Sequence, residues 1–248
     1  MAKKRADRDL FKDTREKSSD VNTNFSVIEA YRTIRTNFLF SVSKKDNCKK
    51  VVFSSSMPRD GKTTTCVNLA ISLSQTDVKI LLIDCDLRKP RSHKFFNLPN
   101  VPGLTNILGG FNSISESIAE TQYRGLHFLP SGIIPPNPAE LISGKHMENL
   151  MEELEKHYDY ILLDSPPLGI VSDAMLLAKI CDGIILVARQ NITSHPDLTR
   201  VIKNLEFAEA DILGIILNQV EVSKRYGYGR YGKQYKNGKY RYDYSYSD

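Results

Sequence analysis

One short loop of the sequence has the residue types that bind phosphate groups. Residues 51–53 (Val-Val-Phe) form an apolar run, Ser-Met-Pro-Arg-Asp-Gly-Lys-Thr follows, and a helical pattern begins after it. In this strand–loop–helix format, the P-loop, backbone N–H groups and the helix N-terminus surround phosphate oxygens. We expect Lys62 to reach the β and γ phosphates of a nucleotide, Thr63 to bind Mg²⁺, and Gly61 to allow close backbone approach. The candidate nucleotide-binding residues of the loop are Ser56, Met57, Pro58, Arg59, Asp60, Gly61, Lys62, Thr63 and Thr64.

The loop departs from the usual P-loop pattern at its first position, where Ser56 stands in place of glycine. The alternative interpretation is an ordinary corner between a strand and a helix, with Lys62 as a surface lysine. The apolar run before the loop and the helical pattern after it favour the phosphate site.

Carboxylates follow two other apolar runs. Asp84 directly follows residues 80–83, and Asp86 lies two residues further on. Asp164 directly follows residues 160–163 and precedes Ser-Pro-Pro. Each aspartate taken alone is equally well explained as a turn or helix-cap residue. Because ligands of parallel α/β sheets bind at the carboxyl ends of the strands, all three are expected to meet at one Mg²⁺–nucleotide centre.

The elements that must position these groups alternate along the chain. The apolar runs are continuous and do not alternate with polar residues, which is typical of strands buried on both faces. The expected strands are residues 51–53, 80–83, 126–129, 160–163, 184–187 and 212–217, and the expected helices include residues 26–40, 63–74, 147–157 and 197–207. This alternation predicts an α/β fold of three layers, the P-loop NTPase fold, with a mostly parallel sheet covered by helices on both faces.

Several longer stretches resemble one family. The chain is similar to the deviant P-loop ATPases, which include partition and septum-placement ATPases, and within them to the bacterial tyrosine kinases of capsule and exopolysaccharide synthesis. The stretches that carry the resemblance are Glu29-Ala-Tyr-Arg-Thr-Ile-Arg, the loop 56–63, Ile83-Asp-Cys-Asp-Leu-Arg-Lys-Pro, Gly103-Leu-Thr-Asn-Ile-Leu-Gly, Leu129-Pro-Ser-Gly-Ile-Ile followed by Pro135-Pro-Asn-Pro-Ala-Glu-Leu, and Leu162-Leu-Asp-Ser-Pro-Pro.

The resemblance implies roles for the site residues, with ATP and Mg²⁺ as cofactors. Lys62 and the three aspartates Asp84, Asp86 and Asp164 are the expected catalytic residues, and Thr63, Asp86 and Asp164 the expected metal-binding ones, Asp164 through water. Asp84 is the expected base for the tyrosine proton. Asn218 resembles a position that contacts adenine, although a turn residue at a strand end is an equally good interpretation. The family loop usually has glycine where this chain has Arg59, so that side chain is expected to point out of the loop.

Glu29, Arg32 and Arg35 match a motif with which the family forms homo-oligomeric rings. Their spacing of three places them along one side of a helix, where they can reach a neighbouring subunit. The spacing by itself favours Glu–Arg pairs inside one exposed helix, and the resemblance reverses that preference.

The end of the chain has a different composition. Residues 223–248 lack aliphatic side chains, so they are expected to form a disordered tail after a kinase domain at 23–222 and a flexible arm at 1–22. The tail has seven basic and two acidic residues and eight of the chain's twelve tyrosines. The expected phosphate acceptors, modified in trans, are Tyr226, Tyr228, Tyr231, Tyr235, Tyr240, Tyr242, Tyr244 and Tyr246.

Two other functions compete with that of a tyrosine kinase. The first is a partition-type ATPase switch, whose P-loop usually has a second lysine early on; no lysine occurs in residues 51–61. The second is an adaptor whose tail binds nucleic acid or a partner, since tyrosine interleaved with basic residues suits nucleic acid. The kinase resemblance makes nucleic acid an unexpected partner.

Composition is consistent with a protein of the cytoplasm. No apolar run approaches the ~20 residues that cross a bilayer, and residues 1–20 lack the apolar core of a secretory signal. The net charge of +5 permits contact with an acidic membrane without requiring it. The resemblance implies a membrane-anchored activator protein that recruits the chain to the inner face of the cell membrane, and a phosphotyrosine phosphatase that reverses the reaction.

Overall fold

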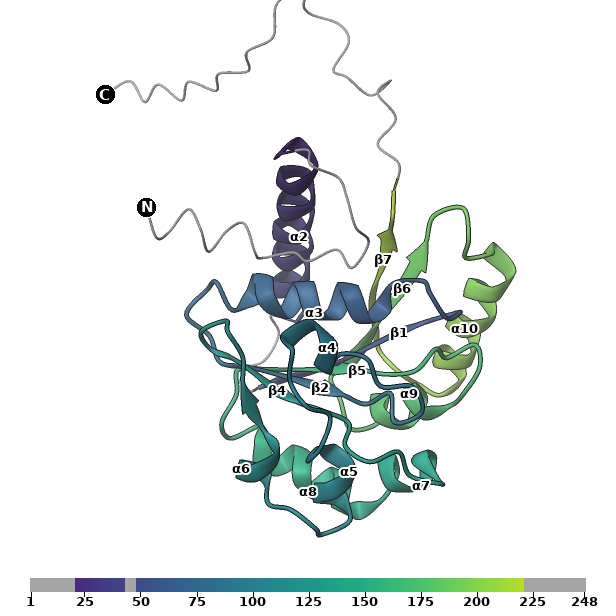
Figure 1. Ribbon diagram of the computed structural model, residues 1–248. Coiled ribbons are helices and arrows are strands. Elements are labelled where there is room, and N and C mark those ends of the chain that lie inside the picture. The colour runs from purple at the N-terminus through teal and green to yellow at the C-terminus, as the bar shows by residue number, and fades with distance from the viewer. Residues whose placement is uncertain (1–20, 43–47, 221–248) are drawn as a thin grey trace, which may run out of the picture.

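The computed structural model describes residues 21–42 and 48–220, and Figure 1 shows their arrangement. The strands are β1 (Lys49–Ser55), β2 (Ile80–Asp84), β3 (Ala119–Glu120), β4 (Leu126–Leu129), β5 (Tyr160–Asp164), β6 (Gly183–Arg189) and β7 (Ile212–Asn218). The helices are α2 (Val21–Val42), α3 (Lys62–Leu73), α4 (His93–Phe96), α5 (Leu104–Leu108), α6 (Ile114–Ser117), α7 (Pro138–Ile142), α8 (Lys145–Leu154), α9 (Asp173–Ala178) and α10 (His195–Phe207). Within these residues, no helix combines the length and the apolar character that crossing a membrane requires.

The strands form one seven-stranded sheet in the order β3-β4-β2-β5-β1-β6-β7. All neighbours are parallel except β3, a two-residue edge strand that runs antiparallel to β4. The three strands that precede the predicted site residues, β2, β5 and β1, are consecutive at the centre of the sheet. Their carboxyl ends therefore lie side by side, and the register pairs Asp84 directly with Asp164.

Helices cover both faces of the sheet, which confirms the predicted three-layer α/β fold (Figure 1). Alternate residues of each central strand enter two separate cores. On β2, Leu81 and Ile83 face the layer of α5 and α7 to α10, whereas Ile80 and Leu82 face α2, α3 and α4. Each face of a parallel sheet needs such a cover, because βαβ crossovers place helices on both sides.

The predicted elements differ from the observed ones at the edges of the fold. The helix expected at 26–40 extends over Val21–Val42, so it is longer at both ends than the apolar pattern predicted. The expectation of burial on both faces is wrong for β7, because it is an edge strand on which Ile215 and Leu217 remain about half exposed. Periodicity did not indicate β3, α4, α5, α6, α7 or α9, which are too short to produce a repeated pattern.

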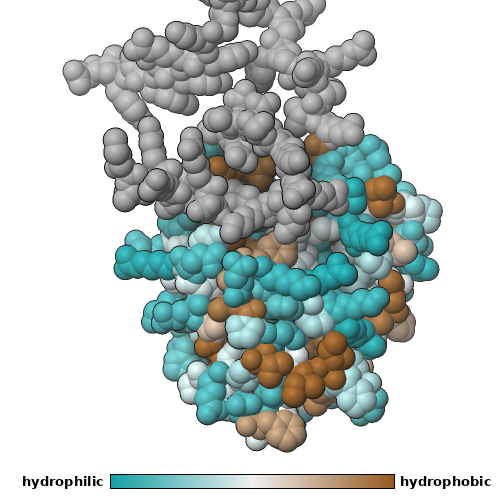
Figure 2. All heavy atoms as spheres, in the orientation of Figure 1, coloured by the Kyte–Doolittle hydropathy of each residue, from teal (hydrophilic) through white to brown (hydrophobic). Residues whose placement is uncertain are grey.

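Other exposed apolar side chains lie beside the short helices that follow β2 and β4. They include Phe111, just after α5, and Ile133 and Ile134 in the loop that precedes α7. Figure 2 shows hydrophobic spheres, among mostly hydrophilic ones, in the lower part of the view, where Figure 1 places α5 to α8. Because they are few and surrounded by polar residues, they do not alter the assignment of the core to the two faces of the sheet.

Two phenylalanines of opposite burial test this assignment. Phe128 is fully buried on β4 with its ring 5.0 Å from that of Phe96, whereas Phe207, at the end of α10, is 93% exposed. Phe128→Ala should lower the free energy of unfolding by about 3–5 kcal/mol, because it leaves a cavity in the core. Phe207→Ala, the matched control, should change it by less than about 0.5 kcal/mol. Urea denaturation followed by circular dichroism measures both, and equal losses would contradict the description of the core.

Candidate active site

The predicted P-loop connects β1 to α3. Gly61 has φ 95° and stands at the N-cap of α3, where no side chain caps the helix. The carboxylate of Asp60 closes the loop, since it accepts the N–H of Met57 at 3.0 Å and the hydroxyl of Thr193 at 2.9 Å. The uncapped N–H groups at the start of α3 are thus available to an anion.

Lys62 brings the predicted site residues together. Its Nζ lies 3.2 Å from Oγ1 of Thr63, 3.4 Å from Oδ2 of Asp86 and 3.2 Å from Oδ1 of Asp164. Burial by itself lowers the pKa of this ammonium, but the charges of Asp164, Asp86 and Asp84 outweigh burial and raise the pKa above its ordinary value. Lys62 is therefore a buried cation surrounded by acids.

Asp84 lies behind this group, fully buried. Its Oδ1 accepts the N–H of Asp86, and its Oδ2 accepts the N–H groups of Arg91 and Ser92, at 3.0–3.2 Å. Burial, and after it the neighbouring charge of Asp164, raise the pKa of Asp84 to about 7. The structure thus places the expected base beneath the loop 85–92, whereas Asp86 retains some exposure.

Two residues that the sequence did not single out complete the site. The hydroxyl of Ser92 donates to Oδ2 of Asp164 at 2.9 Å. Gly169 packs so closely on the P-loop that a Cβ there would overlap the carbonyl oxygen of Ser56. The Ser-Pro-Pro stretch after Asp164 was part of a recognised motif, but its hydrogen bonds with β1 are visible only in three dimensions.

The residues fit a phosphate and a magnesium ion. The Ser56 hydroxyl is buried at the start of the loop and has no hydrogen-bond partner among the described residues. The carboxylates of Asp86 and Asp164 and the hydroxyl of Thr63 are hard oxygen donors, which Mg²⁺ prefers. Lys62 adds a positive charge at the place where phosphate oxygens need neutralising.

Comparison with known proteins agrees with this geometry. Residues 49–215 match the model of an AAA domain. Over 204 residues the chain is 41% identical to the tyrosine-protein kinase YwqD of Bacillus subtilis, covering 82% of this chain and 86% of that protein. It is also 38% identical to the tyrosine-protein kinase CpsD of Streptococcus agalactiae, covering 83% of this chain and 90% of the relative. The chain belongs to the bacterial tyrosine-protein kinases.

Solved structures place this tyrosine kinase in the same fold. The kinase domain of the Escherichia coli tyrosine kinase ETK superposes with a TM-score of 0.76 at 30% identity, covering 92% of this chain and 89% of that one. The chimerical protein CapA2B2 superposes with a TM-score of 0.73 at 34% identity, covering 77% of this chain and 83% of that one. The septum site-determining protein MinD of Pyrococcus horikoshii, complexed with Mg-ADP, superposes with a TM-score of 0.61 at 27% identity. The match covers 72% of this chain and 73% of that one.

Arg59 adopts the left-handed backbone conformation, with φ 72°. This region disfavours side chains other than glycine, so Arg59 occupies a conformation that the glycine expected from the resemblance would adopt more easily. The Arg59 side chain is exposed, as expected for one that points out of the loop.

Asn218, the last residue of β7, packs on the P-loop of the kinase. Its Nδ2 donates to the carbonyl oxygen of Asp60 at 3.0 Å, and a Cβ on Gly61 would overlap this amide. The structure therefore explains Gly61 by contact with Asn218. The contact of Asn218 with adenine stays a prediction.

The predicted oligomerisation residues are split between two environments. Arg32 forms an ion pair with Glu29 at 2.5 Å within α2, the alternative that the spacing left open. Arg35 instead donates to the carbonyl oxygen of Ser72 at 2.5 Å, at the C-terminal end of α3. The tail tyrosines 226–246 lie outside the described residues, so their role as acceptors stays a prediction.

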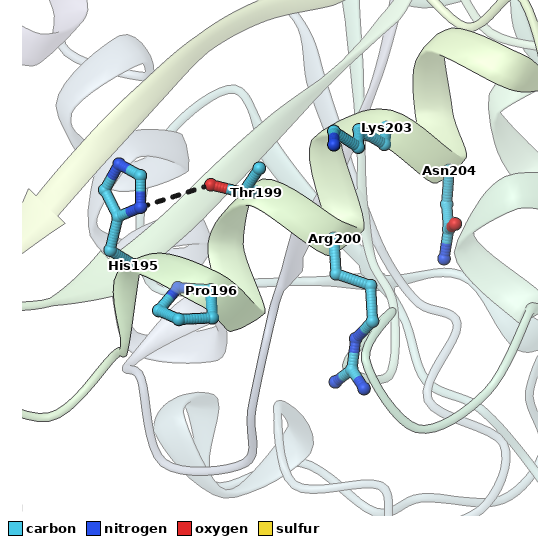
Figure 3. A pocket seen from close by; sticks show the side chains of 6 residues that line it. All are labelled: His195, Pro196, Thr199, Arg200, Lys203 and Asn204. Carbon is cyan, nitrogen blue, oxygen red and sulfur yellow. Dashed lines mark hydrogen bonds between the residues drawn. The ribbon is translucent and has the colours of Figure 1, made fainter.

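A surface hollow along α10 contains none of the predicted site residues. Figure 3 shows that a single helix supplies its labelled lining, with Thr199 bonded to Nδ1 of His195 at 3.4 Å. The lining residues are His195, Pro196, Thr199, Arg200, Lys203 and Asn204. With walls from one helix only, the hollow lacks the convergent groups of the P-loop site.

Gly169→Ala should disrupt the P-loop of the kinase. The added methyl group must displace the backbone carbonyl of Ser56, which cannot rotate away as a side chain could. We expect nucleotide affinity to fall at least about tenfold, a loss of about 1.4 kcal/mol, as measured by calorimetric titration with ADP. Gly214→Ala is the matched control, because a Cβ there meets no atom within 4 Å. Equal affinities of the two variants would refute the proposed support of the loop.

Proposed function

We propose that this kinase uses Mg-ATP to phosphorylate the tyrosines of residues 223–248 in a second copy of the chain. The observation that carries the proposal is the cluster of Thr63, Asp86 and Asp164 around Lys62 beside the P-loop. The similarity to MinD, which was crystallised with Mg-ADP, supports a nucleotide–metal complex at this place. The concentration of tyrosines in residues 223–248 supplies the proposed acceptors.

The cluster suits phosphoryl transfer, which depends on positioning and charge neutralisation. Bound Mg²⁺ would neutralise charge on the β and γ phosphates and hold them in place. Thr63, Asp86 and Asp164 would hold that ion, and Lys62 would exchange its contacts with their oxygens for contacts with phosphate. The N–H groups of residues 56–63, together with the buried Ser56 hydroxyl, would bind the remaining phosphate oxygens.

Asp84 is the proposed acceptor of the phenol proton. Its pKa of about 7 suits a base that operates near neutral pH. It is completely buried and already accepts three backbone N–H groups, so a phenol does not reach it in the conformation that the structure describes. Asp86 is the second candidate, because it is 9% exposed where Asp84 is fully buried, and its Oδ2 lies 3.4 Å from Nζ of Lys62.

The charge of the tail and the resemblance of Glu29, Arg32 and Arg35 to an oligomerisation motif support a proposal about assembly. With seven basic and two acidic residues, the tail is attracted to acidic active sites of neighbouring subunits. Each phosphate adds about −1.5 to −2 charges, so three or four would reverse the sign of the tail. We propose that the kinase forms a homo-oligomeric ring through Glu29, Arg32 and Arg35, and that phosphorylation loosens it.

The biological setting is proposed from the relatives. Control of capsular or exopolysaccharide synthesis and export is the pathway proposed here, in keeping with relatives that share 34–41% identity over most of the chain. One structural relative is a chimera, CapA2B2, which supports docking of a second polypeptide on the kinase. That partner is proposed to be a membrane-anchored activator that recruits a cytoplasmic kinase, with a phosphotyrosine phosphatase opposing it.

A partition-type ATPase switch is the second candidate, because the fold also matches MinD. It predicts hydrolysis of ATP without labelling of the tail. A tail that only binds nucleic acid or another partner would make Lys62 dispensable.

Mass spectrometry of residues 223–248 after incubation with Mg-ATP tests the kinase proposal. The unaltered chain should acquire several phosphotyrosines. In Lys62→Met the rate of phosphorylation should fall at least about 10²–10³-fold, because the transferred phosphoryl group loses its main positive partner. Asp84→Asn and Asp86→Asn, run side by side, separate the two candidate bases.

Transfer in trans is tested by mixing two inactive partners. Lys62→Met with an intact tail should be phosphorylated by a chain truncated after residue 222, which has an active site and no acceptor. ATP hydrolysis without phosphotyrosine in this mixture would favour the switch.

The mass of the assembly, measured by light scattering before and after phosphatase treatment, tests the release model. The dephosphorylated chain should form the larger species, because its basic tail restores attraction to acidic sites. A chain truncated after residue 222 is the control and should not respond. An unchanged mass would rule out release by phosphorylation and leave the kinase activity unaffected.

A further inference from the structure

Two site carboxylates are neighbours across the sheet. Asp84 and Asp164 are register partners on the adjacent strands β2 and β5, and both are almost completely buried. Neighbouring strands lie about 4.8 Å apart, so two like charges are held close together. Among the described residues Lys62 is ion-paired with Asp164, through Oδ1, and not with Asp84. Oδ2 of Asp164 and both oxygens of Asp84 therefore need other donors.

Ser92 supplies donors to both carboxylates. Its backbone N–H donates to Oδ2 of Asp84 at 3.0 Å, and its hydroxyl donates to Oδ2 of Asp164 at 2.9 Å. Ser92 is fully buried, so water does not compete for these bonds. One residue thus joins the two acids, and on Asp164 it contacts the oxygen that Lys62 does not.

The loop that carries Ser92 is fixed at several points. Arg88 forms a bidentate ion pair with the buried Asp173 of α9, at 2.9 and 3.0 Å. The N–H of Lys89 donates to Oδ1 of Asp86 at 3.0 Å. Beyond Ser92, Phe96 is buried and packs on Phe128. These contacts fix the backbone around Ser92, so its hydroxyl projects from a well-defined position.

We propose that Ser92 is a positioning residue for the metal-binding face of Asp164. Its hydroxyl holds Oδ2 and so fixes the rotation of the carboxylate, which keeps Oδ1 directed at the space around Lys62. Thr63 and Asp86 face the same space. The inference rests on the proposed Mg-nucleotide site and adds a residue that orients one of its ligands, as outer hydrogen bonds do at metal sites generally.

The test measures metal binding separately from catalysis. Mn²⁺ is titrated into the full chain with saturating ADP and followed by electron paramagnetic resonance, which distinguishes free from bound ion. Ser92→Ala should raise the half-saturating Mn²⁺ concentration by about 10–100-fold, the usual effect of losing such a partner. Its affinity for ADP without metal should not change. Ser92→Thr keeps the hydroxyl and should bind Mn²⁺ as the unaltered chain does.

A second buried serine provides the matched control. Ser54 is also fully buried, but its hydroxyl donates to the carbonyl oxygen of Pro166 at 2.8 Å and not to a carboxylate. Ser54→Ala should leave the Mn²⁺ titration unchanged, even where it lowers stability as Ser92→Ala does. If Ser92→Ala does not fold, Ser92→Cys, with its weaker donor, should give an intermediate loss.

The outcomes separate this inference from the proposed function. Equal Mn²⁺ affinity in Ser92→Ala, or in Ser92→Cys where that variant is used, would overturn the role of Ser92 alone. A loss of the same size in Ser54→Ala would overturn it too, because the effect would then be structural. Failure of the unaltered chain to bind Mn²⁺ with ADP would overturn the proposed metal site and this inference together.

Discussion

Three buried carboxylates and one lysine ammonium share a small volume at the carboxyl edge of the sheet. Burial of any one of these acids would be costly in isolation, and their proximity adds repulsion. Lys62 offsets part of this cost through Asp164 and Asp86, and backbone N–H groups offset the rest at Asp84. A concentration of acids around a single cation is poorly balanced as a structural device, but it matches the needs of a divalent metal held beside phosphates.

The sheet and its two covering layers position these four charged side chains. Parallel pairing of β2, β5 and β1 aligns the ends of the three strands, and the two apolar cores fix the strands from either side. The segments beyond the strands contact one another. Gly169 packs against the backbone of Ser56, and Arg88 forms a bidentate ion pair with Asp173. Asn218 contacts the P-loop from β7, which makes this strand part of the site even though it is an edge strand of the sheet.

Helix α3 connects this site to the helix that carries the proposed oligomerisation residues. Its first residue is Lys62, and at its other end the carbonyl oxygen of Ser72 accepts a hydrogen bond from Arg35 of α2. A cation at a helix C-terminus is favourable, because it satisfies a free carbonyl and opposes the helix dipole. Helix α3 thus lies between the Arg35 contact and the phosphate loop.

The sequence alone determined the phosphate loop, the strand-end acids Asp84, Asp86 and Asp164, and the three-layer fold, because these depend on local order and on the periodicity of apolar residues. It also distinguished the tyrosine-rich tail by composition. Only the tertiary structure decided that Asp84 lies beneath a loop while Asp86 contacts Lys62, that Arg35 turns inward to α3, and that β7 is an open edge. Ser92 and Gly169 could not be recognised in advance, since their roles arise from contacts with residues 72 and 113 positions away, and such contacts follow from the packing of the chain and not from its local pattern.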